Sequence, residues 1–206
     1  MYAIVEDNNI TQYINNPKSV VIGDVRYPAK IFQLWSQAEL NAIGIYEVIT
    51  DSSNFKDEKW YINTNESYAF ADNQVTRSWG TATPKAHADS LWTQEDSDDG
   101  DLPDDKEVGD VKVEGLKTQL IRTLKSQVAG ILSNTDWYIT RNTEKSTAIP
   151  SSISTYRDAV RTKQAEMETA ITNASDTPAL ETLYTYTTDS DGVQSRPLGE
   201  LPTLEI

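Results

Sequence analysis

The chain has 206 residues, of which 37% are hydrophobic, and its 32 acidic and 18 basic side chains give a formal net charge of −14. The length suits one full domain or two small ones, and the modest hydrophobic share predicts small cores. The acidic balance argues against nucleic-acid binding, the absence of cysteine excludes disulfides and thiolate metal sites, and no apolar run reaches the ~20 residues of a membrane helix.

The start of the chain predicts a β-hairpin. Residues 2–5 and 10–14 are short β-rich runs, and between them Asp7 and Asn8 tolerate the left-handed backbone of a tight turn. Residues 20–22 form a further candidate strand. The N-terminus has neither the basic nor the apolar region of a signal peptide, so we expect synthesis in the cytoplasm.

A short helix should follow over residues 37–43. Ser36 and Glu39 have the spacing of a capping box, in which each side chain satisfies a backbone N–H at the helix start. Gly44 can take the left-handed conformation that ends a helix, and residues 45–49 should then return to a strand.

Three further runs predict a meander of strands, namely residues 59–63, 67–71 and 74–79. Residues 1–84 are therefore interpreted as a small α+β domain with an antiparallel sheet and one short helix. Its aromatic residues are expected mainly in the core, although a sugar-binding platform is a possible alternative use of them.

Residues 85–113 are expected to be an acidic linker. Within this range, residues 95–107 hold eight acids and one lysine, which is typical of a solvated segment. The start of this run resembles a calcium-binding loop. However, Lys106 stands where such a loop needs a glutamate, so no metal site is predicted.

From residue 114 the apolar period becomes helical. Leu116, Leu124 and Val128 share one stripe with other aliphatic residues, which predicts a helix over 114–133. Pro150 suits the first turn of a second helix, so residues 114–174 should form an antiparallel helical hairpin. Asp136 should cap a short turn between the helices, and Trp137 should fill the space under that corner.

Residues 175–206 are rich in proline and glycine and are expected to form an extended tail. Their apolar residues Leu183, Tyr184 and Tyr186 are candidates for docking on a neighbouring protein. Tyr156, Arg157 and Arg161 lie close together on the second predicted helix and are also possible partner-binding residues. Alternatively, the arginines could clamp the helix corner within the chain.

No motif indicates catalysis. His87 is the only histidine and has no evident serine or carboxylate partner, and neither a nucleophile elbow nor a phosphate-binding loop is present. We therefore predict no catalytic, metal or cofactor site, and a protein that is not an enzyme.

Two stretches resemble proteins of tailed bacteriophages. Tyr27-Pro28-Ala29 and the segment from Trp35 to Val48 resemble a module of phage tail and tail-fibre-associated proteins. Leu132, Asp136-Trp137 and the following Tyr156-Arg157 with Arg161 resemble the helical region of phage tail-fibre assembly proteins, also called tail assembly chaperones. The resemblance covers residues 1–50 and 114–173.

The resemblance implies a virion structural protein that attaches or organises tail fibres. The implied partners are other phage tail or fibre proteins, and the implied oligomer is a homo-oligomer, with a trimer as the expectation. Two alternatives stay open: an assembly chaperone absent from the mature particle, and a host-surface glycan-binding module. The implied location is the virion tail, after synthesis in the host bacterial cytoplasm.

Overall fold

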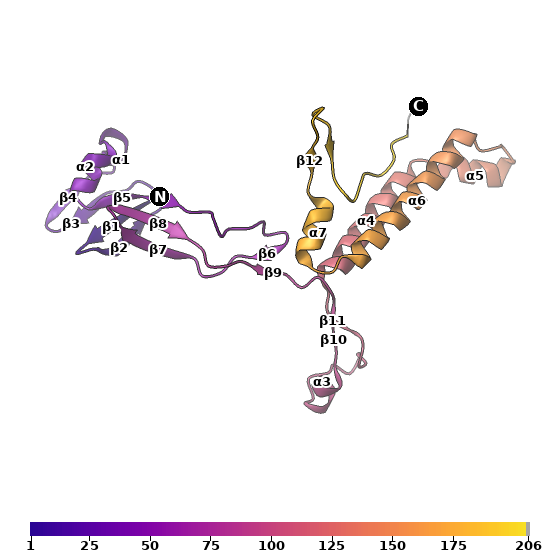
Figure 1. Cartoon of the computed structure of the whole chain (residues 1–206), viewed down its shortest axis with the longest axis horizontal. Coiled ribbons are helices and arrows are strands. Elements are labelled where there is room, and N and C mark those ends of the chain that lie inside the picture. The colour runs from indigo at the N-terminus through magenta and orange to yellow at the C-terminus, as the bar shows by residue number, and fades with distance from the viewer. Residues whose placement is uncertain (205–206) are drawn as a thin grey trace. The chain divides into compact units, whose positions relative to one another are not determined.

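The computed structural model of the chain describes residues 1–204 and confirms the α+β class, with a sheet-rich first part and a helical second part (Figure 1). The chain divides into two compact units, Met1–Thr83 and Pro84–Ile206. Both units bury aliphatic side chains of their own, such as Ile45 in the first and Val160 in the second.

Unit 1 is built on a five-stranded sheet with the strand order β2-β1-β5-β8-β7. The strands are β1 (Tyr2–Glu6), β2 (Asn9–Ile14), β5 (Ile45–Thr50), β7 (Ser67–Ala71) and β8 (Gln74–Ser78). The expectation of an antiparallel sheet is wrong at one pair, because β5 and β8 run parallel. The reason is that the β7–β8 hairpin docks on β5 with its second strand rather than with its first.

The two faces of this sheet carry separate apolar clusters. Ile4 of β1 faces a cluster that includes Leu40, whereas its neighbours Ala3 and Val5 face a cluster around Val75, as the two-residue period of a strand requires. The rings of Tyr13 and Tyr68 lie 4.8 Å apart, centroid to centroid. The outer strands β2 and β7 therefore approach each other, and the sheet is curled.

The predicted first hairpin and the third strand are confirmed. Asp7 and Asn8 have φ values of 49° and 61°, the left-handed pair that suits a two-residue hairpin turn. The third strand is β3 (Val20–Ile22), which pairs with β4 (Val25–Tyr27), a strand that the sequence pattern did not indicate.

Two helices, rather than the expected one, pack on the sheet: α1 (Ile31–Leu34) and α2 (Gln37–Ala42). The predicted capping box of α2 is confirmed, since the Ser36 backbone N–H donates to Glu39 at 2.7 Å and the Glu39 N–H donates to the Ser36 hydroxyl at 3.3 Å. Gly44 ends this region with a φ of 82°, and a Cβ at that position would lie 2.7 Å from the Val5 carbonyl oxygen.

The predicted three-strand meander is confirmed for its second and third strands, since β7 and β8 pair antiparallel, but it is wrong for the first. Only β6 (Tyr61–Ile62) forms in its first segment, and it pairs with β9 (Thr83–Pro84) instead of β7. The Asn63 side chain accepts from the Lys56 N–H and donates to the Lys56 carbonyl, at 3.0 and 2.8 Å. These two bonds tie the ends of residues 56–63 together.

In unit 2 the predicted helical hairpin is formed by α4 (Leu116–Ser133) and α6 (Ser151–Asn173). Lys117 at the start of α4 donates to the Thr172 carbonyl near the end of α6, at 2.8 Å. Arg157 near the start of α6 binds the Leu132 carbonyl at the end of α4, so the helices are antiparallel. Their shared core contains Leu124, Val128, Ile153, Val160, Met167 and Ile171.

The predicted short turn between these helices is instead a ten-residue helix, α5 (Asp136–Lys145). It ends at Ser146, whose φ of 51° is left-handed. No described helix is both long and apolar enough to cross a membrane.

The expected linker has regular structure, and we call residues 90–113 the arm. Its stem is the antiparallel pair β10 (Ser90–Leu91) and β11 (Val111–Val113), and its tip carries α3 (Gln94–Asp98) (Figure 1). The sequence interpretation missed a second capping box, in which Thr93 and Asp96 satisfy each other's backbone N–H groups at 2.8 and 3.2 Å. Most acidic side chains of the arm are exposed to solvent, but the backbone that carries them is a folded hairpin.

The expected extended tail is also partly folded, into α7 (Thr177–Tyr184) and a small hairpin of β12 (Thr187–Thr188) and β13 (Gln194–Ser195). Asp176 caps α7 by accepting from the Ala179 N–H at 2.8 Å, and Pro178 fits the first helical turn. Leu180 is fully buried. Capping and burial together stabilise a helix where proline and glycine suggested none.

Candidate docking site at the helix corner

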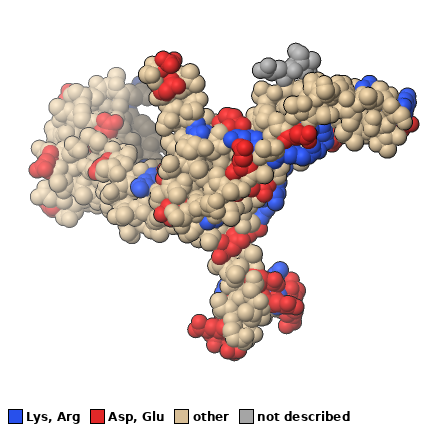
Figure 2. All heavy atoms as spheres, turned by 45° about the vertical axis from the view of Figure 1, so that its right-hand side comes forward, with Lys and Arg blue, Asp and Glu red and all other residues tan. Residues whose placement is uncertain are grey.

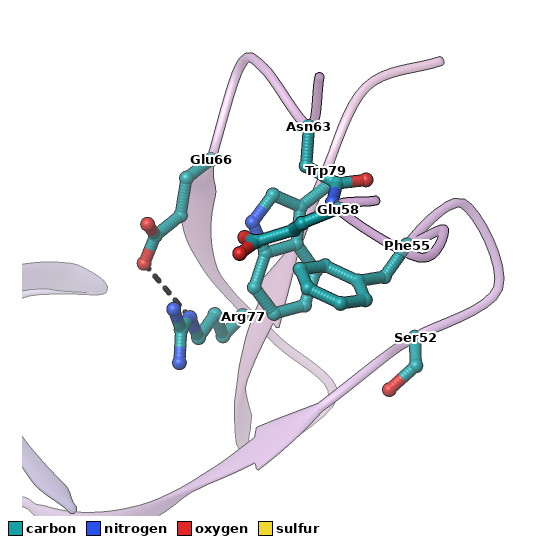
Figure 3. A pocket seen from close by; sticks show the side chains of 7 residues that line it. All are labelled: Ser52, Phe55, Glu58, Asn63, Glu66, Arg77 and Trp79. Atoms are coloured by element: carbon teal, nitrogen blue, oxygen red, sulfur yellow. Dashed lines mark ion pairs between the residues drawn. The ribbon is translucent and has the colours of Figure 1, made fainter. Parts of the chain in front are cut away.

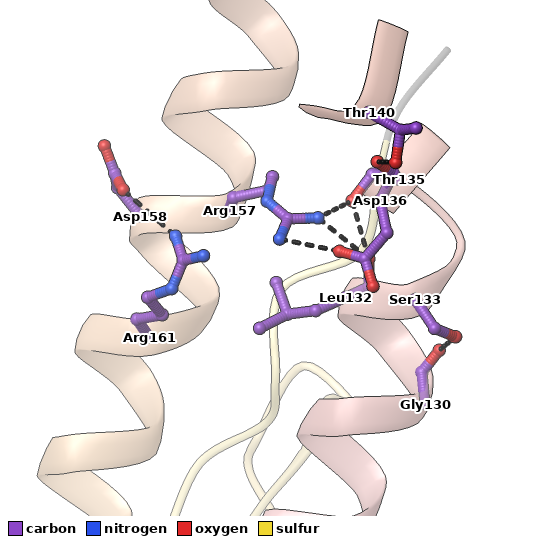
Figure 4. A network of polar contacts seen from close by, with 9 residues as sticks. All are labelled: Gly130, Leu132, Ser133, Thr135, Asp136, Thr140, Arg157, Asp158 and Arg161. Carbon is purple, nitrogen blue, oxygen red and sulfur yellow. Dashed lines mark hydrogen bonds and ion pairs between the residues drawn. The ribbon is translucent and has the colours of Figure 1, made fainter. Parts of the chain in front are cut away.

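Arg157 closes the corner between α4 and α5 from within the chain. Its Nη1 donates to the Leu132 carbonyl at 2.8 Å and to the Thr135 hydroxyl at 2.6 Å. Its Nη2 lies 2.8 Å from Oδ1 of Asp136 (Figure 4). Because Arg157 is only 7% exposed, its guanidinium serves the chain's own corner rather than an incoming partner.

This corner solves a problem common to all helix ends. The last carbonyl groups of α4 have no partner inside the helix, and a buried carbonyl without a donor costs free energy. Leu132 receives bonds from the backbone N–H and the hydroxyl of Thr135, at 3.0 and 2.9 Å, and a further one from Arg157. Thr135 is itself buried, so the polar groups of the corner are enclosed and hydrogen-bonded to one another.

The expected roles of Asp136 and Trp137 are both different in the structure. Asp136 does not cap a turn; it lies in the first turn of α5, where a carboxylate favours the helix dipole, and pairs with Arg157. Trp137 does not fill the space beneath the corner and is 51% exposed. The Asp136–Arg157 pair faces the hairpin, which leaves the next residue along α5 facing outward.

Trp137, Tyr138 and Arg141 form a cluster that we call the corner surface, in which Trp137 is exposed and the other two are half-buried. The two rings lie 3.7 Å apart at 31°, and the Arg141 guanidinium carbon lies 4.7 Å from the Trp137 centroid. Among the described residues, Arg141 has no ion-pair partner, and its Nε is buried without a hydrogen-bond acceptor. Tryptophan, tyrosine and arginine are the residues most enriched at binding hot spots.

The other two candidates on α6 lie apart from the corner surface. Arg161 is exposed and forms a loose pair with Asp158, at 3.4 Å. Tyr156 is half-buried and lines a shallow cavity of about 480 Å³ together with Ala159 and residues 202–204. The structure thus leaves Tyr156 and Arg161 accessible to a partner, in contrast to Arg157.

The tail candidates gather around one arginine. The Arg196 guanidinium carbon lies 5.5 Å from the Tyr184 ring and 5.2 Å from the Tyr186 ring. The Tyr186 hydroxyl donates to Glu200, which raises the pKa of Tyr186, whereas burial raises the pKa of Tyr184. Leu183 is half-buried and accepts the Leu198 N–H, so its role is in part to hold the tail in place.

Unit 1 contains a separate cavity of about 410 Å³ beside Trp79 (Figure 3). The Phe55 ring meets the Trp79 ring edge-on at 4.8 Å, and Arg77 lies 4.5 Å from the same ring. Arg77 also pairs with Glu66, whose pKa is lowered first by the Tyr68 hydroxyl and then by Arg77. The indole ring is therefore partly covered by its own neighbours.

The aromatic residues of unit 1 divide between core and cavity. Trp60 and Tyr61 are buried, as expected of core residues, and cannot offer a platform. Phe55 is the more exposed ring at the cavity, at 41%. The Trp79 ring, which Phe55 and Arg77 partly cover, therefore does not present a fully open face for a sugar.

Within residues 1–204, no group of three or more histidine or acidic side chains is placed to hold a metal ion. In the arm, Asp96 is occupied as a helix cap and as the partner of Lys112. His87 contributes its backbone carbonyl, which accepts from the Lys117 N–H at 3.0 Å.

No protein family, curated protein or solved structure matches the chain. The corner surface must therefore be judged on its geometry. Sequence reasoning missed its exposure and the part played by Arg141. The available signal was the four-residue spacing of Trp137 and Arg141, which places both on one face of a helix.

Proposed function

We propose that this chain is a structural protein of the tail of a tailed bacteriophage, which attaches or organises tail fibres through protein contacts. The observation that carries the proposal is the corner surface. A buried clamp fixes α5, and α5 in turn presents an exposed Trp137 next to an arginine without an anionic partner. Such a surface loses little conformational entropy on binding, because its rings are already ordered.

The sequence resemblance supports the choice of a phage tail. Three residues of the pattern meet at this corner, where Arg157 binds both the Leu132 carbonyl and the Asp136 carboxylate. These three residues share one physical role, which is to fix the direction of α5. The proposed partners are other tail or fibre proteins and further copies of this chain, with a trimer as the working expectation.

Mass spectrometry of purified particles tests the proposal. The experiment needs the phage whose genome encodes this chain, with particles freed of unassembled protein. We expect peptides of the chain in amounts proportional to those of the fibre. Presence in the infected-cell lysate but absence from the particles would favour the alternative function, an assembly chaperone that leaves before maturation.

A further inference from the structure

We propose that the corner surface binds the acidic arm of a second copy of this chain. This inference rests on the proposed function and names one partner of the same surface. The two elements carry opposite chemistry: the arm is densely acidic, whereas the corner surface presents a cation on two aromatic rings. Because each copy carries both elements, the contact would link copies head to tail.

The corner surface calls for an anion. Arg141 stacks on Trp137 and Tyr138, yet among the described residues no carboxylate pairs with it, and its buried Nε lacks an acceptor. A guanidinium is more weakly hydrated than an ammonium group and binds carboxylates through two parallel hydrogen bonds. A carboxylate that reached the terminal nitrogens of Arg141 would therefore pair with a cation for which the described residues supply no carboxylate, whereas the enclosed Nε would stay out of its reach.

The arm is suited to supply that carboxylate. Residues 95–107 hold eight acids, and all but Asp96 are exposed, whereas the helical region 114–174 is richer in bases than in acids. In Figure 2, acidic side chains gather at the end of the arm and basic ones gather along the helices. The arm also exposes apolar residues that could lie against the rings, among them Val108 at 48%.

The arm has a firm base, which limits the entropy lost when it docks. Asp89 accepts from the Gly115 N–H at 2.6 Å and from the Thr118 hydroxyl at 2.8 Å. Gly115 packs so closely that a Cβ there would lie 2.3 Å from the Ala88 carbonyl carbon. The stem thus leaves the start of α4 in a fixed manner, as a preorganised binding element should.

Sedimentation velocity of the full chain over a concentration series tests the contact. We expect the weight-average mass to rise above that of the monomer, with a dissociation constant of about 10 μM, because a small polar contact binds weakly. Two charge reversals should each weaken association at least ~10-fold: Arg141→Glu at the corner, and the pair Asp104→Lys with Asp105→Lys in the arm. Both acids are exposed, and circular dichroism checks that each variant folds.

The decisive part of the experiment restores the contact. Combining the corner and arm reversals in one chain recreates opposite charges where they meet, because the two new lysines adjoin Lys106 and would face the new glutamate at position 141. Association should then return, and an equimolar mixture of the two separate variants should also associate. As a matched control, Glu6→Lys with Glu47→Lys makes the same charge change as the arm variant, but on unit 1. It should leave the weight-average mass equal to that of wild type. A chain that stays monomeric at every concentration, or variants that associate like wild type, would overturn the proposal.

This outcome is independent of the particle experiment. Purified chain that associates through arm and corner, but is missing from particles, contradicts only the tail function. A chain found in particles that does not self-associate contradicts only this inference.

Discussion

The Nη1 atom of Arg157 lies 2.6 Å from the Thr135 hydroxyl, with both residues buried, and this bond ties the start of α6 to the segment that joins α4 and α5. An exposed surface thereby depends on a buried contact. The direction of α5, and with it the display of Trp137, follows from a cluster of polar groups centred on the buried Arg157 and Thr135.

Replacing Arg157 should therefore destabilise the chain. Arg157→Met keeps most of the apolar stem but leaves Thr135 and the Leu132 carbonyl without a charged donor, so we expect the free energy of unfolding to fall by about 2 kcal/mol in urea titrations. Arg161→Met is the control; it removes an exposed pair at 3.4 Å and should cost less than about 0.5 kcal/mol. Equal effects would contradict the clamp.

Gly44 should be intolerant of any side chain. Its φ of 82° and the 2.7 Å approach of the Val5 carbonyl oxygen predict that Gly44→Ala lowers the free energy of unfolding by about 2–3 kcal/mol. Gly23→Ala separates the two causes, because Gly23 has a φ of 56° but no neighbour within 4 Å. It should cost only about 1 kcal/mol when the two variants are compared by thermal unfolding. A cost as large as that of Gly44→Ala would rule out the steric contact.

The helix in the arm should lose support in acid. The Lys112 ammonium, followed by the Thr93 N–H and hydroxyl, lowers the pKa of Asp96 to about 2 from its ordinary value of 3.8. A lowered pKa means that the ionised carboxylate stabilises the folded arm above pH 3.8, and that this contribution is lost as the pH falls through about 2. NMR titration of the Asp96 carboxyl carbon measures this directly. A midpoint at the ordinary value of 3.8 would show that the cap is not formed.

The tail should detach when its apolar anchor is removed. Leu198 is 3% exposed and its N–H donates to the Leu183 carbonyl at 3.0 Å, so Leu198→Ala should cost about 2–4 kcal/mol and speed proteolytic cleavage after residue 185. Val193→Ala, at a position 58% exposed, should change stability by less than about 0.5 kcal/mol. If both variants resist protease like wild type, the tail is not held by Leu198.

Local signals in the sequence predict several elements well. The capping box at Ser36 and Glu39, the turn at Asp7 and Asn8, and the aliphatic stripe of α4 each depend on residues within a few positions of one another. Short-range interactions of this kind can be predicted without knowledge of tertiary contacts.

Where the sequence interpretation went wrong, longer-range contacts decide the outcome. The parallel pairing of β5 with β8 depends on which strand of a hairpin docks, and no residue pattern within β8 encodes that choice. In the arm, the density of acidic residues favoured the interpretation of a linker, and the Thr93–Asp96 capping box was not recognised. Trp137 was expected in the core because aromatic residues usually are, and its exposure follows from the ion pair that joins its own helix, α5, to α6 through Asp136 and Arg157.

The most direct test of the account compares particles grown with Trp137→Ala and with Ile139→Ala, a control that also shortens an exposed apolar side chain of α5. Quantitative mass spectrometry gives the copies of this chain and of the fibre per particle. We predict that Trp137→Ala reduces both at least ~10-fold, as the loss of a hot-spot residue should, while Ile139→Ala leaves them near wild type. Normal amounts of chain and fibre in Trp137→Ala particles would contradict the claim that the corner surface docks tail proteins.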